Sequence, residues 1–158
     1  MKRRKLPLPE DDSDRKLLAD IERVGWHIVG VDADDEGPGY AFSVGLFHTL
    51  EHPEIIIFGL SNETAAELIN VIGVHVQGGA RFHAGDQSND VADGFSVAFT
   101  EVPTDAYREY IGYALWFYES FDFPVLQCVW PDKSGLFAWQ DGYDNRFDQL
   151  QPVLANAT

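Results

Sequence analysis

Three short apolar segments follow one another along the chain with only short links between them. They cover residues 26–31, 40–46 and 54–60, and turn-forming residues such as Pro38 and Pro53 lie between them. Strands joined by short links pair in an antiparallel way, because a parallel pair needs a long crossover connection. The third segment is apolar on both faces, which is typical of a central strand covered on two sides. A sheet with helices packed against it is therefore expected.

The rest of the pattern completes an α+β fold. Apolar spacing predicts helices over residues 13–24, 61–78 and 104–119, the first capped by Ser13 or Asp14 and the second by Ser61 or Asn62. Further strands are expected over residues 95–102, 124–130 and 136–139, with a polar loop over 84–94 and a helical turn within 144–150. We predict a single domain, mainly an antiparallel sheet with about three helices packed against it.

The two ends of the chain differ from the rest. Residues 1–12 are charged, contain two prolines and are predicted to be a disordered tail, which leaves residues 13–158 as the single domain. The basic start is not followed by the apolar region of a signal peptide, and no apolar stretch approaches the roughly 20 residues of a spanning helix. A single cysteine, Cys128, excludes an intrachain disulfide. We therefore expect a cytoplasmic protein that does not enter a membrane.

Charge narrows the choice of partners. The chain has 26 acidic and 11 basic residues, for a net charge of −15. Only four basic residues follow Arg23, namely Arg81, Arg108, Lys133 and Arg146. Such a body cannot neutralise several phosphates, so nucleic-acid binding is not expected. The acidity either serves solubility or attracts a cationic partner such as a basic protein.

The densest group of titratable residues is the segment His48-Thr-Leu-Glu51-His52-Pro53-Glu54. On a helix, the two histidines would share a face and could bind a metal with one of the glutamates. Pro53 disfavours a helix at His52, however, and the segment joins two strands, so we expect a loop at the rim of the domain and no metal. A histidine needs no special environment to exchange protons near neutral pH. We therefore predict His48 and His52 as general acid–base residues.

Aromatic residues form a second group. They crowd the third expected helix and the segment around Trp130, and Tyr113, Trp116 and Trp130 could line a pocket for a planar ligand. The alternative is that these rings pack in the core, with Gln127 or Asp132 serving structure alone. No cofactor is implied by either reading.

A series of short motifs stands in order along the chain. The motifs are Gly25-Trp26, Tyr40-x-x-Ser-Val-Gly45-Leu46, His52-Pro53-Glu54, Phe58-Gly59-Leu60, Gly112-Tyr-Ala-Leu-Trp-Phe-Tyr118, Gln127-x-x-Trp130-Pro-Asp132, Trp139 and Gln151-Pro152. In this order they resemble those of a bacterial family known as domain of unknown function 4262. The resemblance covers about Gly25 to Leu154 and implies a bacterial origin and a shared fold, without supplying an activity or site residues.

Two functions from different classes remain open. The first is a small-molecule-binding or enzyme-like domain whose pocket lies near His48 and His52 and the aromatic residues. The second is an acidic protein-interaction module, for example one that neutralises a basic partner. The sequence decides neither whether the domain is an enzyme nor which ligand, reaction or oligomeric state it has.

Overall fold

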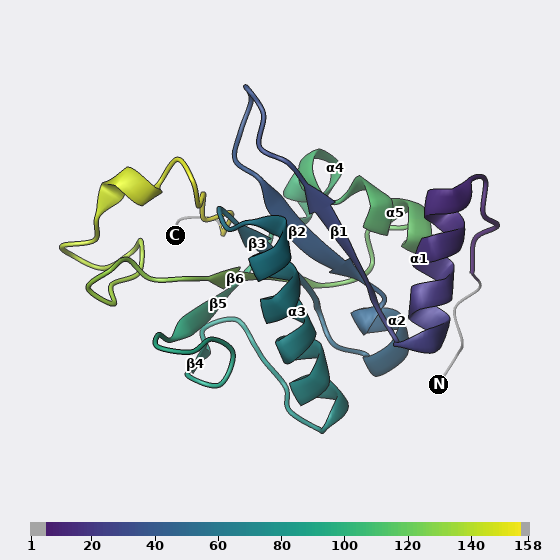
Figure 1. Ribbon diagram of the computed structural model, residues 1–158, viewed down its shortest axis with the longest axis horizontal. Coiled ribbons are helices and arrows are strands. Elements are labelled where there is room, and N and C mark those ends of the chain that lie inside the picture. The colour runs from purple at the N-terminus through teal and green to yellow at the C-terminus, as the bar shows by residue number, and fades with distance from the viewer. Residues whose placement is uncertain (1–5, 156–158) are drawn as a thin grey trace.

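A six-stranded mixed sheet forms the middle layer of the molecule, with helices on both of its faces (Figure 1). The computed structural model describes residues 6–155. The strands are β1 (His27–Val31), β2 (Tyr40–Val44), β3 (Glu54–Phe58), β4 (Gln87–Ser88), β5 (Val97–Glu101) and β6 (Val125–Val129). Their order across the sheet is β1-β2-β3-β6-β5-β4, and all neighbours are antiparallel except β3 and β6. The predicted α+β class and single domain are confirmed.

Helices of unequal length cover the two faces. They are α1 (Asp12–Arg23), α2 (Leu46–Leu50), α3 (Asn62–Gln77), α4 (Tyr107–Tyr110) and α5 (Gly112–Tyr118), with 3₁₀ turns at Thr104–Ala106 and Asn145–Phe147. The helix α3 packs on one face, and α1, α4 and α5 pack on the other. The sheet therefore has a hydrophobic core on each side.

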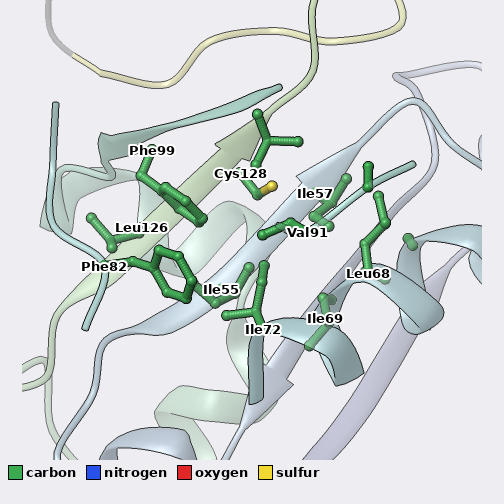
Figure 2. Packing of buried hydrophobic residues seen from close by; sticks show 14 of the residues in the cluster. Ile55, Ile57, Leu68, Ile69, Ile72, Phe82, Val91, Phe99, Leu126 and Cys128 are labelled. Carbon is green, nitrogen blue, oxygen red and sulfur yellow. The ribbon is translucent and has the colours of Figure 1, made fainter. Parts of the chain in front are cut away.

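The central strand β3 supplies both cores by alternation. Ile55 and Ile57 point toward α3, whereas Ile56 and Phe58 point toward α1 and α5, and all four side chains are fully buried. Figure 2 shows the α3 side, where Ile55 and Ile57 meet Leu68, Ile69 and Ile72 of the helix. Burying each such side chain contributes about 1.5–3 kcal/mol. The expectation of a strand covered on both faces is confirmed.

The long helix α3 follows its predicted pattern. Its N-cap is Ser61, whose hydroxyl accepts from the backbone N–H of Thr64. Gly73 lies directly under the Trp26 ring, and a Cβ at this position would stand 2.4 Å from a ring carbon. Glycine is thus required where the helix crosses Trp26. The predicted buried stripe is confirmed in full: Ala65, Leu68, Ile69, Ile72 and Val76.

The first helix begins earlier than predicted. Asp11, not Ser13 or Asp14, is the N-cap, and its carboxylate accepts from the N–H of Asp14 at 2.8 Å. The Asp14 carboxylate in turn accepts from the N–H of Glu10 at 2.8 Å, so two free backbone donors are satisfied reciprocally. Asp12 therefore belongs to α1 and not to a tail. Residues 1–5 of the predicted disordered tail lie outside the described residues.

The predicted third helix is interrupted. Ile111 has φ −126° and ψ 44°, which separates α4 from α5, and Gly112 follows it. Glycine is a poor helix former and weakens the continuation at this point. The break still buries both Tyr107 and Ile111.

Residues 136–139 do not form the predicted strand. The Asp132 carboxylate accepts from the N–H groups of Ser134, Leu136 and Asp144 at 2.8–2.9 Å, which folds the segment into turns. The backbone of Trp130 pairs instead with the side chain of Gln151, which both accepts from it and donates to it. A side chain thus occupies the place of a neighbouring strand.

Candidate functional site

His52 lies inside the molecule and has no exposed surface, so its predicted position at the rim is wrong. Its Nδ1 is 2.9 Å from the carbonyl oxygen of Pro53, and its Nε2 is 3.1 Å from the backbone nitrogen of Phe82. A carbonyl only accepts and an N–H only donates, so the ring is neutral with its proton on Nδ1. Burial lowers the pKa of His52 below its usual 6.5. Both nitrogens are engaged by backbone groups, and the ring has none to offer a ligand.

His48 lies on a short helix and not in the predicted loop. The helix α2 begins after Gly45 and ends at Leu50, and its C-cap Glu51 has a left-handed φ of 55°. The imidazole is half-buried and contacts the edge of the Phe117 ring at 5.5 Å between centroids. Pro53 does end the helical conformation, but only after one full turn has formed. The acid–base role of His48 stays a prediction.

A buried carboxylate explains why this helix forms. Glu54 is 1% exposed and accepts from the N–H groups of Gly45, Leu46 and Phe47 at 2.9, 3.1 and 3.3 Å. These are the free donors at the start of α2. Gly45 reaches this position with φ 117°, and a Cβ there would lie 2.9 Å from the Gly25 carbonyl oxygen. Glu54 therefore caps α2 from the neighbouring strand.

Two hydroxyl groups complete the shell of Glu54. Ser43 donates at 2.7 Å and accepts from the N–H of Ile55, while Tyr118 donates to Glu54 and accepts from the N–H of His48. The backbone donors fix the direction of both hydroxyl protons toward the carboxylate. Burial raises the pKa of Glu54 above its usual value, although the hydrogen bonds from Tyr118, Ser43 and Gly45 act to lower it. Five donors are directed at its two oxygens, so the group has no lone pair left for a metal ion.

The three predicted aromatic pocket residues are not brought together. Trp130 belongs to the core on the α3 face, and its Nε1 donates to the carbonyl of Phe58 at 2.8 Å. Tyr113 and Trp116 lie on the opposite face, with ring centroids 5.4 Å apart. The Tyr113 hydroxyl donates to Asp14 and so ties α5 to α1. Packing, the alternative reading, accounts for all three contacts.

An open groove of about 670 Å³ lies elsewhere, at the edge of the sheet between α1, β1 and α3. Its apolar surface comes from Val24, Trp26, Ile28 and Val74, and Val74 is 62% exposed. The remaining lining residues are Lys16, Asp20, Arg23, His27, Asn70 and Gln77. Charged groups from α1 thus face amide groups from α3 across an apolar floor, an arrangement common in small-molecule sites.

His27 and Asp20 form a close pair in this groove. The His27 Nδ1 is 2.7 Å from the Asp20 Oδ2, and both side chains are 15% exposed. Burial raises the pKa of Asp20, but the bonds from His27 and Arg23 and the charge of Lys16 outweigh it, so the pKa lies below 3.8. The ionised carboxylate accepts the proton on Nδ1 and leaves Nε2 without a hydrogen-bond partner among residues 6–155.

The other groups of the groove are also held in place. Asp20 accepts from Lys16 at 3.4 Å and from Arg23 at 3.2 Å, so two cations surround one carboxylate. The Trp26 Nε1 donates to the Asn70 Oδ1 at 2.9 Å, which turns the amide NH₂ of Asn70 away from the ring as an available donor. The groove carries a local excess of positive charge on a strongly acidic protein.

Sequence reasoning missed this pair. Asp20 and His27 are seven residues apart, and the chain reverses between them at Gly25, which has φ 111°. The predicted helix stop at Gly25 was the available signal, because it brings the last turn of one element against the first residue of the next.

Three other features concern the chemistry that the protein can support. Within the described part of the chain, no three His, Cys, Asp or Glu side chains gather so that they could hold a metal ion. Burial raises the pKa of Cys128 to about 12, so its thiol is inert. Over residues 6–155, the helices are all too short or too polar to cross a bilayer.

Comparison with known proteins identifies a family but no relative of known activity. A family model described as "Domain of unknown function (DUF4262)" matches residues 20–144. No curated protein and no solved structure matches the chain.

Proposed function

The chain belongs to the family of domains described as DUF4262, and we propose that it binds a small organic acid in the groove between α1, β1 and α3. The observation that carries this proposal is the His27–Asp20 pair: His27 lines the groove, and its Nε2 has no hydrogen-bond partner among residues 6–155. The family match begins at Asp20 and covers every lining residue of the groove except Lys16.

The chemistry of the groove sets the class of ligand. Lys16 and Arg23 supply charge for a carboxylate, and the amide of Asn70 supplies donors on the opposite side. The Nε2 of His27 accepts from a hydroxyl or amine of the ligand, because Asp20 holds the proton on Nδ1. The ligand's apolar part would cover Val24 and Val74. The same Nε2 can also take a proton from the bound group, as a general base.

This proposal moves the pocket away from the histidines that the sequence favoured. His52 is sealed by backbone groups, and the aromatic rings of Tyr113 and Trp130 lie on opposite faces of the sheet. We further propose that the protein works in the bacterial cytoplasm, where a reducing environment keeps the free thiol of Cys128 unpaired. Fractionation of cells that produce it would test that location.

The binding proposal is tested with a panel of small hydroxy, amino and keto acids. Thermal shift would be followed by calorimetric titration on the wild type, on His27→Gln and on His83→Gln. His83 is a matched control, since it pairs with Asp86 at 3.3 Å outside the groove and is 73% exposed. We expect binding that H27Q weakens at least about tenfold and H83Q leaves unchanged. Binding that is insensitive to H27Q, or no binding across the panel, would contradict the proposal.

A further inference from the structure

The strand β1 is one edge of the sheet, and its outer side is open. The N–H of Gly59 donates to the carbonyl of Gly39 at 2.9 Å, so the backbone groups of Gly39 point toward β3. Because these directions alternate along β2, the backbone groups of Tyr40, Phe42 and Val44 point toward β1. There these three residues lie opposite Val31, Val29 and His27. The backbone groups of Ile28 and Gly30 therefore point outward, and they have no hydrogen-bond partner among residues 6–155.

Opposite charges lie at the two ends of this edge. At the His27 end, Lys16 and Arg23 project from α1 with exposed side chains. At the Val31 end, the chain enters an exposed turn with four acids, Asp32, Asp34, Asp35 and Glu36. Figure 1 shows the connection between β1 and β2 extending beyond the rest of the molecule.

We propose that β1 pairs with β1 of a second copy of this chain, antiparallel and centred on Val29. In this register Ile28 of one copy lies opposite Gly30 of the other, and these are the residues whose backbone groups point outward. Two copies would share one continuous sheet through four backbone hydrogen bonds. The interface is self-complementary, as a twofold axis requires.

Charge is what identifies the occupant as a second copy. An antiparallel pair places the acidic turn of each chain against Lys16 and Arg23 of the other, so the same attraction occurs twice. An unrelated peptide strand would pair equally well only if it had one basic and one acidic end in the same order along its length. A second copy of this chain carries both charges beside its own β1. This inference goes beyond ligand binding in the groove, although Lys16, Arg23 and His27 belong to both surfaces.

Charge reversal tests the pairing, and sedimentation of the full-length chain measures it. One variant makes the turn basic, Asp35→Lys with Glu36→Lys, and the other makes the α1 surface acidic, Lys16→Glu with Arg23→Glu. Asp34 is left intact because its carboxylate accepts from two backbone N–H groups of the turn. The matched control, Asp105→Lys with Asp122→Lys, changes two exposed acids away from β1. Circular dichroism checks that each variant is folded.

We expect a wild-type dimer that weakens as salt rises, because the paired charges are exposed. Each variant alone should dimerise at least about tenfold more weakly, and an equimolar mixture of the two should recover wild-type affinity as a heterodimer. The control should dimerise like the wild type. A monomeric wild type at low salt, a mixture that does not recover, or a control as weak as the variants would each overturn the proposal. Loss of ligand binding in H27Q with intact dimers keeps the two proposals separate.

Discussion

Two carboxylates of this protein illustrate the difference between a structural and an open polar cluster. Glu54 is 1% exposed and takes five donors, three backbone N–H groups and two hydroxyls that are themselves held by backbone N–H groups. Asp20 is partly exposed and is bonded to two exposed cations and to a histidine whose second nitrogen has no partner in the described part of the chain. The first cluster has no capacity left for a ligand. The second has unused donors and an unused acceptor at a groove, which is why we assign binding to it.

Replacing one acceptor oxygen of Glu54 should have the largest effect on stability. In Glu54→Gln, the amide NH₂ would face N–H and O–H donors that bond to the carboxyl oxygens in the wild type, so several buried donors lose this acceptor. We expect a loss of about 3 kcal/mol or more in the free energy of unfolding measured by urea. The matched change Asp20→Asn should cost less than about 1 kcal/mol. Equal costs would remove the distinction between the two clusters.

Removing one hydroxyl should have an intermediate effect. Tyr118→Phe leaves the N–H of His48 without this acceptor and Glu54 with one donor fewer, so we expect a loss of about 1–3 kcal/mol. Tyr113→Phe removes a similar bond, to Asp14, at a half-buried position and should cost less. Urea unfolding of both variants measures the difference. A larger loss for Y113F than for Y118F would contradict the comparison.

Acidification should lower the stability of the folded protein through the buried histidine, His52. The pKa of His52 is lowered in the folded state by burial, so the unfolded chain binds its proton first as the pH falls below about 6.5. The contribution of neutral His52 to the free energy of unfolding is therefore complete above that pH. At lower pH the free energy of unfolding decreases, by at most about 1.4 kcal/mol per pH unit. Urea unfolding between pH 7 and 5 should show a smaller slope for His52→Gln than for the wild type. An equal slope in His52→Gln and in the wild type would contradict a buried neutral His52.

The pattern of apolar residues predicted the layers of the fold well, because burial is read directly from periodicity. The strand at β3 and the buried stripe of α3 needed only local spacing and one cap, Ser61. The strand expected over residues 136–139 was wrong because Asp132 and Gln151 replace strand pairing with side-chain hydrogen bonds, and nothing local distinguishes such residues from solvated ones.

The candidate site was harder to predict than the fold. The sequence drew attention to His48 and His52 because histidines that are close in sequence suggest chemistry. The residue that organises this segment is Glu54, and its hydrogen bond to Tyr118 joins positions 64 residues apart. A glutamate at the start of a strand gives no local sign that it is buried. Likewise, the groove needs α3 to lie beside β1, which the order of elements alone does not specify.

The most direct test of this account is a long-range ¹⁵N–¹H NMR spectrum of the imidazole rings, recorded with and without an acid that binds. The histidines serve as internal reporters, since His27 is at the groove, His52 is sealed and His83 is exposed elsewhere. We predict that the acid shifts the Nε2 signal of His27 alone and that His52 stays a neutral Nδ1–H ring throughout. A ligand that shifts His52 or His48 and leaves His27 unchanged would contradict the assignment of the groove as the binding site.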